Sequence, residues 1–265
     1  MSNVINYRPA QPFFELTTEN YESRLASARQ QLAQYYSFVI SPDAKESVVA
    51  VPDGSIDILF HCSSSKPQAL VCGSVKKGKR VEFAKGNLYF GARFYPGKAN
   101  LLLNCPLDQF TEKEITLSDV QKKADGLAEK ICSAGSFEER VQLFEQFHCK
   151  MEKQLSSPAL VNYILKKINE CNGDIRIQEL AEETGYSTRY INSSFKKHVG
   201  IAPKLFLRIV RFQRCFNNLR SQAHHLNFAD LALEAGYYDQ AHFINEFKEF
   251  SLYTPAQAHN VAQYQ

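Results

Sequence analysis

The chain has 265 residues, 44% of them apolar and 22% charged, which is the composition of a globular protein long enough for two domains. It contains no apolar run near the roughly 18 residues of a membrane span. Its first residues also lack the basic stretch and apolar core of a signal peptide. We therefore expect a cytoplasmic protein without a membrane partner. The formal net charge of +3 is too small to indicate a class of partner, so the distribution of charge matters more.

The cysteines argue against two kinds of site. Their number is odd, and none of them has the C-x-x-C spacing typical of a zinc cluster or a redox motif. We interpret them as reduced, mostly buried side chains, with a redox or alkylation sensor as the alternative. We expect no metal and no cofactor. The seven positions are Cys62, Cys72, Cys105, Cys132, Cys149, Cys171 and Cys215.

Residues 1–118 have a pattern of strands and turns. β-branched and aromatic residues concentrate in four segments, and turn-forming sequences such as Pro52-Asp-Gly54 lie between them. Short strands at regular spacing indicate a small barrel or sandwich. Residues 19–34 are polar and rich in alanine, which predicts a helix. The predicted strands are residues 35–40, 47–51, 55–60 and 87–94.

Helical spacing begins near residue 119. It predicts helices at 119–133 and 137–155, the second starting at a capping box formed by Ser136 and Glu139. This helical hairpin could pack against its own domain or against a second subunit. The sequence Ser156-Ser157-Pro158 then marks the predicted boundary between a first domain, residues 1–157, and a second domain, residues 158–265.

The second domain is predicted to be entirely helical, so the fold class is α+β with two domains. Glycine and proline divide it into segments, including one long helix that links an earlier group of helices to a later one. The predicted helices are residues 162–172, 177–183, 188–198, 203–220, 228–234, 239–250 and 255–260.

Positive charge is concentrated inside this second domain. Residues 186–220 contain eight basic side chains and no Asp or Glu. A solvated helical face normally mixes both signs, whereas a surface that neutralises nucleic-acid phosphates is one-sided. The segment therefore favours nucleic-acid binding. Its basic residues are Arg189, Lys196, Lys197, Lys204, Arg208, Arg211, Arg214 and Arg220.

An internal repeat makes this interpretation specific. Leu180-Ala181-x-x-x-Gly185-Tyr186 recurs as Leu231-Ala232-x-x-x-Gly236-Tyr237, and Phe195-Lys196 recurs as Phe247-Lys248. In each copy the alanine allows close helix contact and the glycine ends the first helix in a left-handed conformation. The spacing predicts two helix-turn-helix units, each presenting its second helix to a DNA major groove.

The segment Gly236-Tyr-Tyr-Asp-Gln-Ala-His-Phe-Ile-Asn-Glu-Phe-Lys-Glu-Phe250, followed by Thr254-Pro255, resembles the signature of the AraC/XylS family of transcription regulators. The similarity extends over residues 162–258. It implies a monomeric seven-helix domain that reads two major-groove segments of promoter DNA and often activates RNA polymerase. Val51-Pro-Asp-Gly-Ser55 and Gly91-Ala-Arg-Phe-Tyr-Pro-Gly97 resemble a sensor domain found in some of these regulators, without implying its ligand.

Nine exposed positions of the two recognition helices are the predicted DNA contacts. Arg189 is the best candidate for a bidentate contact with guanine, and Asn192 could pair with adenine. Lys196 is expected to hold a phosphate. The second unit is less basic and should contribute less affinity. The full set is Thr188, Arg189, Asn192, Ser193, Lys196, Gln240, Ala241, Asn245 and Lys248.

In the sensor domain Arg93, Asp53 and Asp57 are the candidate effector-binding residues, with Arg93 as an anion anchor. The alternative is that these three side chains only stabilise turns. We predict a non-enzymatic activator that binds double-stranded promoter DNA, RNA polymerase and a small-molecule effector, and that could form a homodimer. Gating by a protein partner, or a domain that serves only for dimerisation, remains open. A DNA-repair alkyl acceptor is disfavoured because the cysteines lack closely paired zinc ligands.

Overall fold

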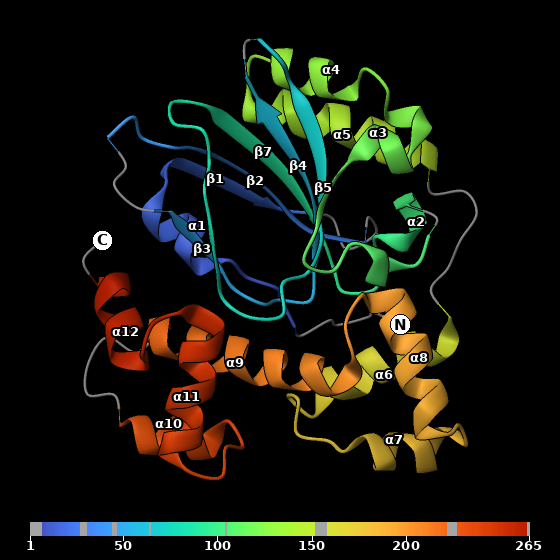
Figure 1. The fold of residues 1–265 in the computed structure, drawn as a ribbon, viewed down its shortest axis with the longest axis vertical. Helices are drawn as coiled ribbons and strands as arrows, with labels where there is room; N and C mark the ends of the chain where they lie inside the picture. The colour runs from blue at the N-terminus through green and yellow to red at the C-terminus, as the bar shows by residue number, and fades with distance from the viewer. Residues whose placement is uncertain are drawn as a thin grey trace.

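A computed structural model of the chain describes residues 7–26, 31–43, 47–63, 65–103, 105–151, 158–221 and 227–263. A β-rich N-terminal part lies against an all-helical C-terminal part, as Figure 1 shows. This arrangement confirms the predicted α+β fold class. No helix in these ranges combines the length and the apolar composition needed to cross a membrane.

The N-terminal part is built on a six-stranded antiparallel sheet. The strand order is β1-β2-β7-β4-β5-β8, and β3 and β6 pair separately as a two-stranded antiparallel ribbon. All four predicted strands are present with shifts of a few residues at their ends. The strands are β1 Glu19–Leu25, β2 Leu32–Val39, β3 Val48–Ala50, β4 Ile56–Cys62, β5 Gln68–Cys72, β6 Lys79–Val81, β7 Leu88–Phe94 and β8 Glu114–Thr116.

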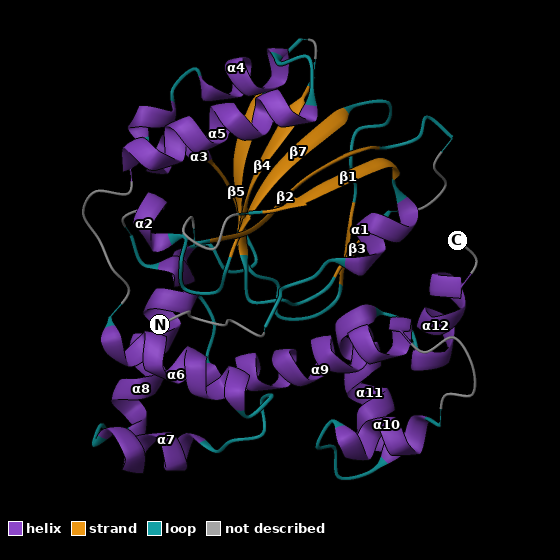
Figure 2. Cartoon of the chain, turned by 180° about the vertical axis from the view of Figure 1, so that it is seen from behind, coloured by secondary structure: helices purple, strands orange, loops and turns teal. Residues whose placement is uncertain are grey.

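The two faces of the sheet have different partners because successive side chains of a strand point to opposite sides. Ile58 and Phe60 of β4 belong to a core shared with α4 (Leu127–Ser133) and α5 (Phe137–Met151). Figure 2 shows these helices across that face. Leu59 faces the other side, where Phe14 of α1 (Pro12–Thr17) and residues of β3 cover the sheet. The result is a layered sandwich, with helices on one face and a ribbon on the other.

Two predictions for this part were wrong. Residues 19–34 do not form a helix, because Glu19–Leu25 pairs with β2 as strand β1, and the ladder of backbone hydrogen bonds outweighs a weak helical preference. Residues 119–133 are not one helix either. They form the end of α3 (Leu117–Val120), a 3-10 turn at Lys122–Ala124 and α4, and Gly126, with φ of +72°, interrupts them.

The C-terminal part contains the helices predicted from glycine and proline positions. Gly185 ends α7 in the left-handed conformation, and the hydroxyl of Ser187 accepts a hydrogen bond from the Tyr190 amide to start α8. The bounds are α6 Ala159–Glu170, α7 Ile177–Thr184, α8 Thr188–Val199, α9 Pro203–Ser221, α10 Phe228–Glu234, α11 Gln240–Ser251 and α12 Pro255–Gln263.

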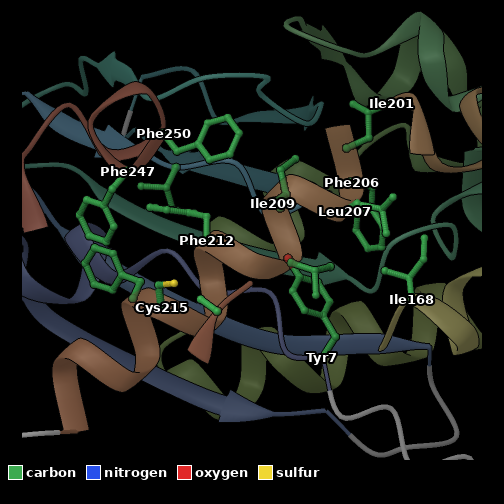
Figure 3. Packing of buried hydrophobic residues seen from close by; sticks show 14 of the residues in the cluster. Tyr7, Ile168, Ile201, Phe206, Leu207, Ile209, Phe212, Cys215, Phe247 and Phe250 are labelled. Atoms are coloured by element: carbon green, nitrogen blue, oxygen red, sulfur yellow. The ribbon is translucent and has the colours of Figure 1, made fainter. Parts of the chain in front are cut away.

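The helical core also contains residues from the N-terminal segment. The Phe13 ring lies 5.5 Å from the Phe216 ring and 5.0 Å from the Tyr253 ring, measured between centroids. Tyr7 packs edge-on against Phe206 of α9 at 5.6 Å, and Figure 3 shows it beside that helix. Ser156 and Ser157, at the predicted domain boundary, lie outside the described residues, and the division at residue 157 stays a prediction.

Candidate nucleic-acid interface and effector pocket

The first helix-turn-helix unit consists of α7 and α8. Leu180 of α7 and Ile191 and Phe195 of α8 are fully buried in the helical core, as the sequence spacing predicts. The opposite face of α8 points to solvent. The five predicted contacts on this helix, Thr188, Arg189, Asn192, Ser193 and Lys196, are all exposed.

An exposed aromatic pair beside these residues was missed by the sequence analysis. The rings of Tyr186 and Tyr190 stack 5.1 Å apart and are 48% and 53% exposed. Tyr186 occupies the turn and Tyr190 the first turn of α8. The internal repeat gave no clear indication of this pair, because Tyr237, the counterpart of Tyr186 in the second copy, is buried. The pair enlarges the surface that α8 presents.

The second unit, α10 and α11, has the same arrangement. Phe243 and Phe247 are buried, and Tyr237 packs against Phe243 with ring centroids 5.4 Å apart. The predicted contacts on α11 are all exposed, whereas Ile244 is half-buried. The carboxylate of Asp239 caps the helix by accepting a hydrogen bond from the His242 amide. The exposed positions are Gln240, Ala241, Asn245 and Lys248.

The long helix α9 joins the two units, and part of its positive charge is neutralised internally. The Arg208 guanidinium is 2.6 Å from the Glu246 carboxylate and 2.7 Å from the Glu249 carboxylate of α11. Glu246 also accepts a hydrogen bond from the Tyr237 hydroxyl. Arg211 lies over the Tyr237 ring. Arg208 therefore fastens α9 to the second recognition helix, which leaves it poorly placed for a phosphate.

The N-terminal part contacts both recognition helices at their C-terminal ends. The Thr111 hydroxyl donates a hydrogen bond to the carbonyl of Gly200, directly after α8. Lys77 pairs with Glu249 at 3.1 Å, and the Gly78 amide donates to the Glu249 carbonyl. In Figure 1 the starts of α8 and α11, beside α7 and α10, lie at the edge away from the sheet. The predicted contacts near the starts of α8 and α11 therefore lie on the side away from the N-terminal sheet.

Two segments of the chain are similar to known protein families. Residues 180–260 match a helix-turn-helix domain family, and residues 28–116 match a domain of unknown function, DUF6597. The chain is 31% identical over 107 residues to the F1 operon positive regulatory protein of Yersinia pestis. It is 29% identical over 103 residues to an uncharacterised helix-turn-helix transcriptional regulator of Haemophilus influenzae. These matches cover 40% and 39% of this chain and 34% of each relative.

Residues 180–260 of the chain form a helix-turn-helix domain of the type found in the AraC family of transcription regulators. This is a family of DNA-binding proteins and not of enzymes. Among solved structures, ToxT of Vibrio cholerae is similar with a TM-score of 0.46 at 9% identity, over 91% of this chain and 98% of ToxT. The C-terminal domain of AraT from Geobacillus stearothermophilus gives 0.37 at 22% identity, over 40% and 88% of the two chains.

The N-terminal part of the chain has a cavity of about 540 Å³ between the sheet and the β3-β6 ribbon. Aromatic side chains line one part of it, including Phe14, Phe83 and Tyr89, and charged groups line another. The three predicted effector-binding residues, Arg93, Asp53 and Asp57, come together in its wall.

These three residues form a buried ion cluster. The Arg93 guanidinium lies 2.7 Å from the Asp57 carboxylate and 3.5 Å from that of Asp53, and it also covers the Tyr36 ring. Burial alone would lower the pKa of Arg93, but the two carboxylates outweigh it and hold that pKa well above its usual range. Nη1 of Arg93 has no hydrogen-bond partner among the described residues.

Asp53 is the group in this cluster whose protonation should change near neutral pH. Burial raises the pKa of Asp53 from 3.8 to about 6, although Arg93 acts in the opposite direction and Asp57 in the same one. At pH values between 3.8 and about 6, Asp53 is protonated in the folded protein but ionised in the unfolded chain. The stability that this proton provides is complete near pH 4 and is lost as the pH rises through 6.

Asp53→Asn is therefore expected to flatten the pH dependence of stability. Relative to the variant, the parent should lose up to about 1.4 kcal/mol of unfolding free energy per pH unit between pH 4 and pH 6. Urea unfolding at several pH values would measure this difference. Asp125→Asn, at an exposed position, serves as the control and should follow the parent profile. Parallel profiles for the parent and Asp53→Asn would contradict the assignment.

The cavity wall is connected to the DNA-binding part through Gln213 of α9. The buried Gln213 amide donates hydrogen bonds to the carbonyls of Ala10 and Pro52, and its carbonyl accepts one from the Ala10 amide. Next to these residues, Gln11 donates to Asp53 and lines the cavity. Gln11 and Asp53 thus line the cavity, while their sequence neighbours Ala10 and Pro52 bind α9. Helix α9 in turn joins the two helix-turn-helix units.

The described residues hold no group of three or more His, Cys, Asp or Glu arranged to bind a metal. All seven cysteines are free thiols.

Proposed function

We propose that this AraC-type regulator binds promoter DNA by placing α8 and α11 in successive major grooves, about 34 Å apart. The observation that carries the proposal is that all nine predicted contacts are exposed, while the apolar stripes of both helices are buried. The buried contacts of α9 hold the two units at a fixed separation. Genome-wide mapping of bound DNA would test the proposal, since it should yield sites with two half-sites in constant spacing.

The two units should contribute unequally. Helix α8 carries Arg189, Lys196 and Lys197, all exposed, whereas α11 carries Lys248 and two glutamates. Those glutamates are already paired with Arg208. Each phosphate neutralised by a lysine or arginine releases counterions, so most of the salt-dependent affinity should come from the first unit.

Arg189→Ala is expected to relax specificity at one base pair, with a loss of about 1–3 kcal/mol of discrimination. Lys196→Ala should instead weaken binding to all sequences alike and reduce the salt slope by about one. Binding of both variants to a randomised DNA library at several salt concentrations would separate the two effects. Lys166→Ala, an exposed lysine on α6 paired with Glu170, is the matched control. If both test variants behaved like this control, the assignment would be wrong.

We further propose that the N-terminal part senses a small-molecule effector in its cavity and that the protein activates transcription by recruiting RNA polymerase. The cavity volume is within the range of small-molecule sites. Gln213 of α9 binds Ala10 and Pro52, which are next in sequence to cavity-lining residues. The relative from Yersinia pestis is described as a positive regulator, which supports activation. A promoter-reporter assay with purified polymerase should show transcription rising when the regulator and effector are both present.

Thermal-shift screening of metabolites is expected to find a ligand that raises the melting temperature by mass action. Phe83→Ala, which removes a half-buried aromatic ring from the cavity wall, should reduce the shift. Phe137→Ala, a half-buried ring packed against Phe90 on the other face of the sheet, should preserve it. An equal reduction in both variants would place the ligand elsewhere. A response only to protein partners, or only to dimerisation, would replace the effector proposal.

A further inference from the structure

Two cysteine thiols meet where helix α4 packs on the sheet. Cys62 is the last residue of β4, and Cys132 lies near the end of α4, on the face of the sheet opposite the cavity. The thiols are close enough to share a hydrogen bond. Both side chains are half-buried, so a small solute can reach them. They are 70 residues apart in sequence, which is why their spacing gave no motif.

A guanidinium lies beside this pair. Arg140 of α5 donates a hydrogen bond from Nη2 to the carbonyl of Ala134 at 2.7 Å. Its Nε is buried and has no hydrogen-bond partner among the described residues. The positive charge of Arg140 acts on both thiols and favours their ionised forms. Positive charge beside a partly exposed thiol is the environment in which cysteines react with oxidants.

The two thiols are not equivalent. The hydrogen bond from Cys132 lowers the pKa of Cys62, against the effect of burial and with help from Arg140. The same hydrogen bond raises the pKa of Cys132. Burial raises the pKa of Cys105 and that of Cys215, the latter to about 12. Cys62 is thus suited to be the attacking thiolate and Cys132 to be the thiol that follows it.

We propose that Cys62 and Cys132 form a hydroperoxide-sensitive dithiol that closes to a disulfide. The Cys62 thiolate attacks one peroxide oxygen, the O–O bond breaks, and the departing oxygen takes a proton to leave as water or an alcohol. Cys62 is then a sulfenic acid. The Cys132 sulfur attacks the Cys62 sulfur, and the hydroxyl leaves with the Cys132 proton as water. Two thiols are oxidised, one hydroperoxide is reduced, and one S–S bond forms.

The disulfide would tie α4 covalently to a central strand of the sheet. Strand β4 carries Asp57 and His61 on its other face, where both line the cavity. Oxidation would therefore hold fixed the strand that supports the cavity wall. This chemistry is independent of DNA binding and of any effector.

The experiment treats the full-length protein with hydrogen peroxide at low molar excess, blocks the remaining thiols by alkylation, and maps the peptides by mass spectrometry. The expected result is a peptide pair linked through Cys62 and Cys132, which disappears after treatment with a reductant. Linkage of other cysteines, or uniform oxidation of all exposed thiols, would overturn the proposal.

Three variants make the roles separable. Cys132→Ser should stop the reaction at the Cys62 sulfenic acid, which dimedone traps, and Cys62→Ser should leave Cys132 as a thiol. Cys149→Ser, at an exposed cysteine of α5, should give the same linked pair as the parent. Loss of the free Cys149 thiol at a rate equal to or above the loss of the free Cys62 thiol in the parent protein would contradict the proposal, and this comparison needs no variant to fold.

Discussion

Arg93→Met is expected to lower the unfolding free energy by roughly 3–5 kcal/mol. The substitution keeps most of the side-chain volume but removes the only cation that contacts both Asp53 and Asp57 within the described residues. Two carboxylates would then remain close together in the wall of the cavity, one of them almost fully buried. A carboxylate without its partner in such a place is costly because neither water nor a counter-charge compensates it. Urea denaturation with an unchanged slope would measure the loss.

The matched control is Arg24→Met. Arg24 also pairs with two carboxylates, those of Glu138 and Glu145, but its side chain is 38% exposed. Water screens such pairs, so the expected loss is about 1 kcal/mol or less. Equal losses for the two variants would show that burial does not determine the strength of the Arg93 cluster. Low pH should reduce the cost of Arg93→Met, because protonated Asp53 needs no cation.

Phe13→Ala is expected to cost about 3–5 kcal/mol. The ring is 1% exposed and fills a space between α9 and the segment after α11, against Phe216 and Tyr253. Its removal leaves a cavity that neighbouring rings cannot fill without moving. Because the ring joins the N-terminal part to the helical core, the variant should also unfold in two steps rather than one. Differential scanning calorimetry would show both the lower melting temperature and the separated transitions.

Tyr238→Ala is the control for this prediction, since the Tyr238 ring is 90% exposed. Its stability should stay within about 0.5 kcal/mol of the parent. A single transition in Phe13→Ala, shifted no more than that of Tyr238→Ala, would mean that the packing of Phe13 does not join the two parts.

The sequence was sufficient for the C-terminal part because its signals are local. Ser187, Gly185 and Pro203 each act on their own helix end, and the structure places those ends within a residue or two of prediction. Burial of Ile191 and Phe195 follows from a spacing of four residues. The exposure of the DNA contacts follows from the same periodicity, since one face of a helix can be assigned once the other is buried.

The N-terminal part depends on partners that are far away in sequence, and prediction was weaker there. The sequence of strand β1 is polar and predicts a helix, yet pairing with β2 makes this segment a strand. The pairing of Arg208 with Glu246 was also hidden, because Glu246 lies 38 residues downstream of Arg208 and outside the acid-free segment. The sequence predicted that Arg93, Asp53 and Asp57 bind an effector or stabilise turns. It did not predict that the three side chains form one buried ion cluster.

The position of residues 7–16 affects how this regulator could be recombined with others. Tyr7 and Phe13 pack within the helical core, and the backbone of Ala10 binds Gln213. A hybrid made by grafting residues 158–265 onto a foreign sensor would leave Phe216 and Gln213 without the groups that cover them. The exchangeable unit is therefore discontinuous. Residues 158–265 must be transferred together with residues 7–16, although about 140 residues separate the two segments in the sequence.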